Sequence, residues 1–214
     1  MTAEGCVISR NSGGYIGGGV HVDEADAKLT NCTISDNETI GDGGGVYCRA
    51  SDPVFTNCII SQNSSDRGGG VATDWNAHPR FFYCTVSDNN ALRAGAIANY
   101  WATALYGCIV WGNRPADTLE EDLSATFCDI EGGCPGRGNI DADPRFTSYR
   151  DFEYLLEAGS PCIDAGSRRI PDGIQWPSWY RNFSLFSDMG AWGGPGAGGG
   201  AVARLEWKGL GEVA

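Results

Sequence analysis

The chain has 214 residues, which is enough for one domain with a sizeable core or for a short solenoid. Its formal charge of -12 disfavours nucleic acid as a partner, and it has no run of 18 apolar residues that would insert into a membrane. Glycine is frequent, at 32 residues, but it does not follow the three-residue period of collagen.

The start of the chain, Met1 to Ile8, has neither the basic region nor the long apolar stretch of a signal peptide. We therefore expect either that a signal has been removed or that the sequence is a piece of a longer chain.

An internal repeat begins directly after this start. A cysteine followed two residues later by Ile or Val, and then by a polar stretch ending in Asn, recurs at positions 6, 32, 58, 84 and 108. The steps between these cysteines are 26, 26, 26 and 24 residues, and Cys128 follows after 20 more. A Gly-Gly-Gly-Val motif lies between them at 17–20, 43–46 and 68–71, with a weaker copy at 94–97. A third apolar segment closes each unit, at 28–30, 54–56, 80–82 and 104–106.

Each unit therefore holds three short segments in which apolar and polar residues alternate, separated by polar or glycine-rich corners. No unit contains ten residues of helical periodicity. Three short strands joined by corners make one coil, and stacked coils form parallel sheets with strands about 4.8 Å apart. The repeat predicts an all-β fold, a single-stranded parallel β-helix with coils of about 26 residues.

The repeated cysteines and asparagines are predicted to form structural ladders through the stack. The cysteine ladder consists of small buried side chains at Cys6, Cys32, Cys58, Cys84, Cys108 and Cys128. The asparagine ladder consists of Asn11, Asn37, Asn63, Asn89 and Asn113. Asn tolerates the left-handed conformation that a corner needs, and its amide can bond the copies above and below. Cys48 falls within a strand, which leaves Cys134 and Cys162 as the only plausible disulfide pair.

The period breaks in the last third of the chain. We expect parallel coils over residues 1–127, a final coil and an irregular C-terminal cap over 128–192, and a glycine-rich linker with a terminal segment over 193–214. A solenoid needs an end that covers its last apolar rung, and residues 128–192 are predicted to be that end.

Three segments carry a family resemblance: residues 128–146, from Cys128-Asp129-Ile130 to Pro144-Arg145-Phe146; residues 160–166, Ser-Pro-Cys-Ile-Asp-Ala-Gly; and residues 188–192, Asp-Met-Gly-Ala-Trp. Together they resemble the closing segment of secreted bacterial right-handed parallel β-helix proteins with a pectate-lyase-like fold. The repeats are also similar to those of polymorphic outer-membrane proteins and other adhesins. The resemblance implies a right-handed coil and a secreted or cell-surface location. It says little about activity, because this fold hosts lyases, hydrolases, adhesins and surface-layer components.

The least repetitive positions of the repeat are the candidates for a binding site. Counting from the Val of each glycine motif, the third position gives Asp23, Arg49, Asp74 and Tyr100, and the fourth gives Glu24, Ala50, Trp75 and Trp101. Exposed aromatic rings stack on pyranose rings, and nearby carboxylate and guanidinium groups bond the hydroxyls. The predicted carbohydrate-binding residues are Trp75, Trp101, Tyr100, Asp74, Arg49 and His78. The alternative is a surface charge ladder of little energetic value, with the tryptophans packed under a loop.

An enzyme is the runner-up hypothesis. As the resemblance implies, lyases of this fold use clustered acidic residues for Ca²⁺ and an Arg or Lys as the base, whereas hydrolases place carboxylates across the scissile bond. Asp74 with Arg49 and Tyr100 is the best catalytic trio for a polysaccharide lyase or glycoside hydrolase. His21 and His78 are isolated from any zinc-type or triad spacing.

Calcium is the one cofactor for which the sequence offers ligands. Acidic turns at Asp141, Asp143, Asp164, Asp172 and Asp188 have the oxygen donors that Ca²⁺ prefers. The competing interpretation is that these aspartates bond the backbone of their own turns.

The open first coil suggests a third possibility. The chain begins inside a coil, and an uncovered parallel edge is covered either by a preceding segment or by another copy stacked head to tail. From the resemblance, the candidate binding residues and this open coil together, we predict an extracellular, non-catalytic module for adhesion, glycan binding or surface assembly. Its predicted partners are an extracellular polysaccharide or other copies of itself.

Overall fold

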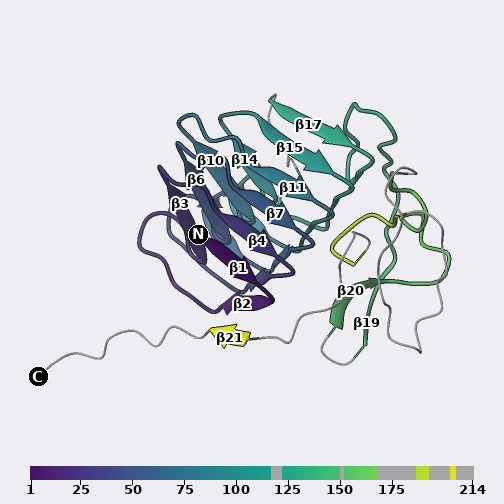
Figure 1. Ribbon diagram of the computed structural model, residues 1–214, viewed down its shortest axis with the longest axis horizontal. Helices are drawn as coiled ribbons and strands as arrows, with labels where there is room; N and C mark the ends of the chain where they lie inside the picture. The colour runs from purple at the N-terminus through teal and green to yellow at the C-terminus, as the bar shows by residue number, and fades with distance from the viewer. Residues whose placement is uncertain (117–121, 150–151, 168–186, 193–202, 206–214) are drawn as a thin grey trace, which may run out of the picture.

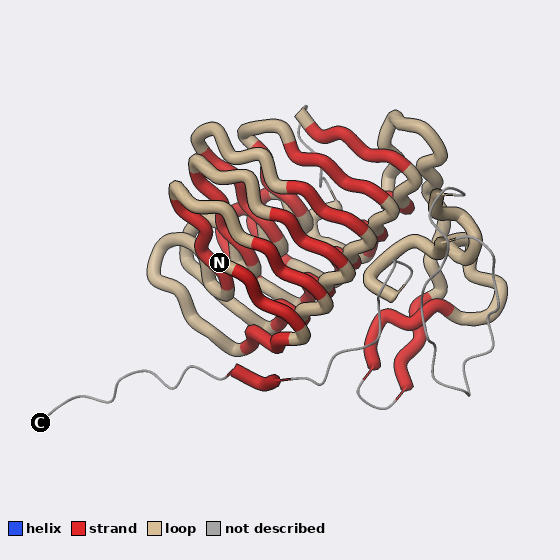
Figure 2. The backbone as a smooth tube through the Cα atoms, viewed as in Figure 1, coloured by secondary structure: helices blue, strands red, loops and turns tan. Residues whose placement is uncertain are grey.

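Stacked coils of short strands form the body of the protein. The computed structural model describes residues 1–116, 122–149, 152–167, 187–192 and 203–205. Figure 1 shows the strands of successive coils side by side, and Figure 2 shows that the described residues contain strands and loops without a helix. The all-β solenoid expected from the repeat is therefore present, and no described segment is a helix that could cross a membrane.

Three parallel sheets run along the stack. Sheet 1 consists of β1 (Thr2–Glu4), β4 (Lys28–Thr30), β7 (Val54–Thr56), β11 (Arg80–Phe82), β15 (Thr103–Tyr106) and β17 (Leu123–Thr126). Sheet 2 consists of β2 (Cys6–Ser9), β5 (Thr33–Ser35), β8 (Ile59–Ser61), β12 (Thr85–Ser87), β16 (Ile109–Trp111) and β18 (Asp129–Ile130), with β21 (Ala203–Leu205) at its N-terminal edge. Sheet 3 consists of β3 (Val20–Asp23), β6 (Val46–Arg49), β10 (Val71–Asp74) and β14 (Ile97–Asn99).

Two smaller sheets complete the fold. One is a parallel pair, β9 (Ser64–Arg67) and β13 (Asn90–Arg93), in the corner between sheets 2 and 3. The other is an antiparallel hairpin, β19 (Phe146–Tyr149) and β20 (Phe152–Leu156), which lies beside the coils in Figure 1.

The core is built from columns of side chains that point inward from equivalent positions. Sheet 1 contributes fully buried Leu29, Phe55 and Phe81, and the rings of the two phenylalanines stack with their centroids 4.7 Å apart. The predicted cysteine ladder lies in the same core cluster, and all nine cysteines of the chain are free thiols. Alternation within each strand is what places one column in the core and its neighbour outside.

The asparagine ladder forms as predicted in its hydrogen bonding but not in its backbone. Each ladder amide donates through Nδ2 to Oδ1 of the next, as from Asn37 to Asn63 at 3.0 Å and from Asn63 to Asn89 at 2.9 Å. The left-handed residue of the corner is the one before each Asn, such as Asp36 and Asp88 with φ of 55° and 56°. The prediction that Asn itself adopts this conformation was wrong. The preceding residue makes the turn, and the buried Asn amide is thereby free to point along the stack.

The glycine motif has two separate structural roles. Gly43 adopts φ of +74°, which turns the chain into β6. At Gly45, a Cβ atom would lie 2.6 Å from the carbonyl oxygen of Gly70 in the next coil. The first glycine therefore provides a backbone conformation and the third provides room for close stacking.

The C-terminal segment lies in two places. Residues near Ile140 cover the last coil, where the Ile130 N–H donates to the Ile140 carbonyl at 3.0 Å. The hairpin and the segment 187–192 pack instead on the outer face of sheet 2, where Ile109 joins Leu156, Cys162 and Met189 in one buried cluster. The expected cap therefore covers the side of the stack as well as its end, because Ile59 and Ile109 point outward from sheet 2 and need apolar cover.

Candidate functional site

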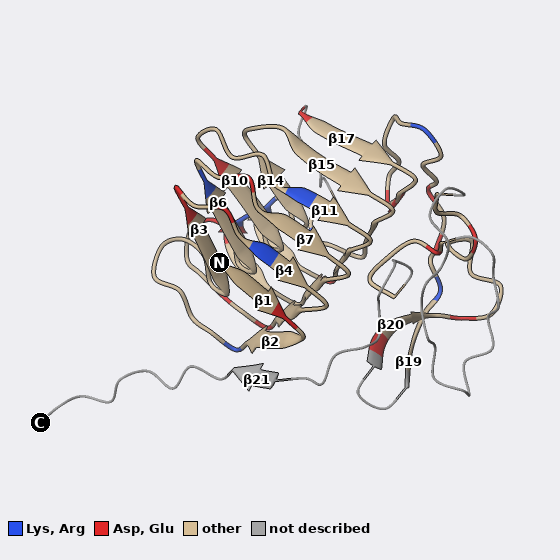
Figure 3. Cartoon of the chain, in the orientation of Figure 1, with Lys and Arg blue, Asp and Glu red and all other residues tan. Residues whose placement is uncertain are grey.

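The outer face of sheet 3 carries two columns of polar and aromatic side chains. Val20, Val46 and Val71 pair in register, so that His21, Tyr47 and Ala72 form one outward column. Asp23, Arg49 and Asp74 form the second column in the register that the repeat predicts. Figure 3 shows this second column as alternating red, blue and red at the ends of β3, β6 and β10.

Arg49 is held by the acidic residues of the preceding coil. Its Nε lies 2.7 Å from Asp23 Oδ1 and its NH2 group lies 2.9 Å from Asp23 Oδ2, which makes a bidentate pair. The same NH2 group lies 3.3 Å from Glu24 Oε1. The hydrogen bond from Arg49 holds the pKa of the Asp23 carboxyl below its usual value, and the bond to Asp23 raises the pKa of Arg49. Of the expected charge ladder of Asp23, Arg49 and Asp74, Asp23 and Arg49 form an ion pair at the surface.

Asp74 is held by Tyr47. The Tyr47 hydroxyl donates to Asp74 Oδ2 at 3.0 Å, and the backbone N–H of Trp75 donates to Asp74 Oδ1 at 2.8 Å. Burial, together with the hydrogen bond to Asp74, raises the pKa of Tyr47. The His21 ring meets the Tyr47 ring edge-on at 5.2 Å. These contacts fix the Asp74 carboxylate as a hydrogen-bond acceptor on the face of the sheet.

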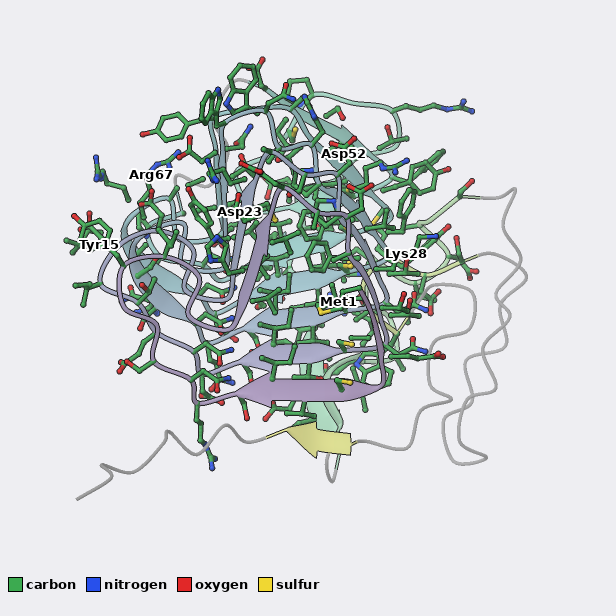
Figure 4. All side chains as sticks on the ribbon, turned by 60° about the vertical axis from the view of Figure 1, so that its left-hand side comes forward. Met1, Tyr15, Asp23, Lys28, Asp52 and Arg67 are labelled. Carbon is green, nitrogen blue, oxygen red and sulfur yellow. The ribbon has the colours of Figure 1, made fainter. Side chains whose placement is uncertain are left out.

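Arg67, which ends β9 in the corner next to sheet 3, contacts Tyr100 and is a residue that sequence reasoning missed. Its side chain is 4% exposed, its guanidinium carbon lies 3.6 Å from the centroid of the Tyr100 ring, and its NH1 group lies 3.7 Å from Asp42 Oδ2. Figure 4 labels Asp23 and Arg67 in a view that brings the N-terminal coils forward. The sequence signal that could have found Arg67 is its place in the repeat. Arg67 stands directly before a glycine motif, where Asp42 stands one coil earlier.

Three aromatic rings stand exposed beside these ion pairs. Trp75, Tyr100 and Trp101 are 65%, 57% and 40% exposed, and we refer to them as the aromatic shelf. They follow directly after β10 and β14, in neighbouring coils. The guanidinium of Arg49 lies 6.0 Å from the Trp75 ring. These rings offer apolar stacking surfaces at the ends of β10 and β14.

His78 contacts a different group. Its Nδ1 lies 3.1 Å from Asp52 Oδ1, at a shallow hollow on the corner between sheets 3 and 1. The residues lining this hollow are Asp52, His78, Pro79, Arg80, Ala102, Thr103, Ala104 and Ser124. The structure thus groups five of the six predicted binding residues on sheet 3 and its edge, and it places the sixth with Asp52.

The trio predicted for an enzyme is engaged in three separate interactions. Asp74 accepts from Tyr47, Arg49 is paired with Asp23 and Glu24, and Tyr100 stacks on Arg67. A guanidinium paired with two carboxylates is a poor proton acceptor, because the pairing stabilises its charged form. The geometry suits hydrogen bonding to a ligand better than proton transfer.

Comparison with known proteins identifies the family. A family model described as "Right handed beta helix region" matches residues 1–119, more than half of the 214-residue chain. The chain belongs to the right-handed β-helix family. No curated protein and no solved structure matches this β-helix.

Three of the calcium candidates of this β-helix accept hydrogen bonds from backbone N–H groups, and Asp143 does so within its own turn. Asp141 Oδ1 accepts from the Gly132 N–H, Asp143 Oδ1 from the Arg145 N–H and Asp188 Oδ1 from the Asp164 N–H. No three Asp, Glu, His or Cys side chains within the described residues converge to hold a metal ion. Asp172 lies outside the described residues.

The two cysteines outside the ladder are engaged separately. Cys134 packs against the core of the coils, and the Cys162 thiol donates to Asp129 Oδ2 at 2.9 Å. The other oxygen of this fully buried carboxylate accepts the Ala142 N–H at 3.1 Å. Burial raises the pKa of Asp129 to about 6, and it raises the pKa of Asp188 to about 6 as well.

Proposed function

We propose that this β-helix is a non-catalytic extracellular or cell-surface module that binds a carbohydrate on the outer face of sheet 3. The observation that carries the proposal is the aromatic shelf. Trp75, Tyr100 and Trp101 stand exposed in neighbouring coils next to Asp74, whose carboxylate is held by the Tyr47 hydroxyl.

Stacking and hydrogen bonding together explain why this surface suits a sugar. The faces of a pyranose ring are apolar C–H surfaces that pack on an aromatic ring, while its hydroxyls point outward around the edge. Carboxylates at Asp23, Glu24 and Asp74 accept hydrogen bonds from those hydroxyls. Because the shelf spans neighbouring coils about 4.8 Å apart, more than one ring of an extended glycan can be in contact at once.

Rigid placement supports binding by this face. The aromatic residues follow strands whose inner side chains are fully buried, as with Val71 and Ile97, and the Arg67 guanidinium supports the Tyr100 ring from behind. A site held by a packed sheet loses little conformational entropy on binding.

The test is binding to a glycan array, followed by titration calorimetry with the best ligand. The variants Trp75→Ala and Trp101→Ala are each expected to weaken binding at least tenfold, because each removes a stacking surface. Tyr15→Ala is the control, since Tyr15 is an exposed aromatic residue outside the shelf. Binding that survives both tryptophan changes, or no binding to any glycan, contradicts the proposal.

Self-assembly is a second candidate, favoured by one observation. The strand β21 pairs in parallel with the edge strand β2, with Cys6 opposite Ala203 and Ile8 opposite Leu205. The first coil of sheet 2 therefore accepts a further parallel strand in coil register. Light scattering at several concentrations, with and without EDTA, tests for stacking: mass that grows with concentration supports it, and a constant monomer rules it out for this chain.

A further inference from the structure

We propose that the carbohydrate bound on sheet 3 is uncharged, and that this face discriminates against glycans bearing carboxylate or sulfate groups. This inference rests on the proposed function and narrows its ligand class. It follows from the way in which the cations of this face are already neutralised and the anions are left exposed.

The first cation of the face, Arg49, is already paired with two carboxylates. Arginine binds a carboxylate through one of the two-pronged edges of its planar guanidinium. Asp23 occupies the Nε–NH2 edge through two contacts of 2.7 and 2.9 Å, and Glu24 contacts the same NH2 group at 3.3 Å, so a sugar carboxylate would have to compete with both of them for Arg49. Arg49 is also the only Lys or Arg in the four strands of sheet 3.

The second cation, Arg67, is enclosed. The Tyr100 ring covers its guanidinium at 3.6 Å, Asp42 lies 3.7 Å from its NH1 group, and only 4% of the side chain is exposed. A ligand that stacks on the outer side of Tyr100 meets the aromatic ring and not the charge behind it. Arg67 therefore holds the shelf in place and offers no direct contact to an anion.

The anions of the face remain accessible. The side chains of Glu24, Asp23 and Asp42 are 73%, 38% and 31% exposed. Counting Asp74 as well, four carboxylates face two guanidinium groups, which leaves a local charge of 2 − 4 = −2. The whole chain adds to this field, with a formal charge of -12.

The net negative charge of this face and its hydrogen-bond acceptors both favour a neutral sugar. Exposed carboxylates accept hydrogen bonds from neutral hydroxyls, whereas a uronate or sulfated chain brings one negative charge with nearly every ring toward a negative face. The neutral sugar gains hydrogen bonds where the acidic sugar meets repulsion.

The test compares oligosaccharide pairs that differ only in charge: a neutral oligosaccharide and the same oligosaccharide oxidised to the carboxylate at C6. Calorimetry at about 50 and 300 mM NaCl is the measurement, because screening acts on exposed charges. The neutral member of each pair is expected to bind at least tenfold more tightly at low salt, with a difference that shrinks at high salt.

A charge variant provides the internal control. The double variant Asp23→Asn, Glu24→Gln releases Arg49, and it is expected to bind the oxidised oligosaccharide about tenfold more tightly than the wild-type chain does. If the wild-type chain binds the oxidised member more tightly, and Trp75→Ala loses that binding, the inference of an uncharged ligand is wrong. Carbohydrate binding itself would still stand. No binding of either member across the set overturns the proposed function itself.

Discussion

Asn63 shows how one side chain joins three coils. Its Oδ1 accepts the backbone N–H and the side-chain amide of Asn37, each at 3.0 Å, and its Nδ2 donates to Asn89 Oδ1 and to the Ile34 carbonyl. The residue is fully buried, so water cannot replace any of these hydrogen-bond partners. The side chain therefore contributes to stability by providing hydrogen-bond partners for buried polar groups in the coils on either side.

Replacing this residue tests the ladder. Asn63→Ala leaves the buried donors of Asn37 without their acceptor and removes a hydrogen bond to the Ile34 carbonyl, and it is expected to lower the free energy of unfolding by about 2–4 kcal/mol. Urea denaturation is the measurement. Asn11→Ala, at the half-buried end of the ladder, removes fewer bonds and should cost clearly less. Equal losses in the two variants would show that the ladder does not act through buried bonds.

Asp129 gives the protein a predictable response to pH. Its pKa is raised from 3.8 to about 6 by burial, so the folded chain holds a proton that the unfolded chain has already released. Stability is therefore greatest below about pH 4 for this group and falls as the pH rises toward 6. Asp188 acts in the same direction for the same reason.

The corresponding variant is Asp129→Asn, which removes the titrating group and keeps the size of the side chain. Between pH 4 and pH 6 the wild-type chain is expected to lose at most about 3 kcal/mol of unfolding free energy through Asp129, and the variant should lose that much less. Urea denaturation at each pH measures this, with exposed Asp36→Asn as the control. A variant that retains the full pH dependence would contradict the assignment.

At the scale of elements, the outer face of sheet 2 determines where the C-terminal segment lies. Ile59 and Ile109 point outward in register with Thr85, and the hairpin covers them. Polar contacts fix the hairpin and the segment 187–192 on this face: the Tyr154 hydroxyl donates to Asp88 Oδ2 at 2.9 Å, and the Ala191 N–H donates to Thr85 Oγ1 at 3.0 Å.

Ile109→Asp is expected to release this segment from the coils. The change buries a carboxylate among Leu156, Cys162 and Met189, which is strongly unfavourable without a partner. Limited proteolysis should then cut within residues 143–192 while circular dichroism of the coils persists. Thr33→Asp is the control, because Thr33 lies in the same outward column and is only half-buried. Equal protease resistance in both variants would contradict this packing.

The sequence predicted the regular elements better than the irregular ones. The 26-residue step is enough to align Val20, Val46 and Val71, and the columns of sheet 3 follow from that alignment. The left-handed corner residues and the enclosed Arg67 were missed, because several residue types fill those positions and no repeated letter marks them. The packing of the hairpin on sheet 2 has no periodic signal at all.

At the scale of the whole molecule, the strands of each coil pair with those of the coils next to it in the stack, and the C-terminal segment adds contacts to several coils. Local opening in such a solenoid begins at an end and spreads inward. The C-terminal coils carry the additional cover of the hairpin on sheet 2, whereas β3 and β4 belong to the first coils.

Hydrogen exchange should reflect this asymmetry. Amides of β8, β12 and β16 are expected to exchange at least tenfold more slowly than those of β3 and β4, because the former lie under the hairpin or in mid-stack. Mass spectrometry of peptic fragments resolves the two regions. Uniform exchange over all coils would instead indicate a single cooperative unit.

The asparagine ladder also bears on how such a chain can change in length. Every amide in it donates in the same direction, from Asn11 through Asn37, Asn63 and Asn89 to Asn113. A duplicated 26-residue unit inserted into the gene would bring its own donor and acceptor in the correct orientation. Growth by whole repeats would thus preserve the interior while lengthening the outer face of sheet 3 by one new row, on which selection could act independently.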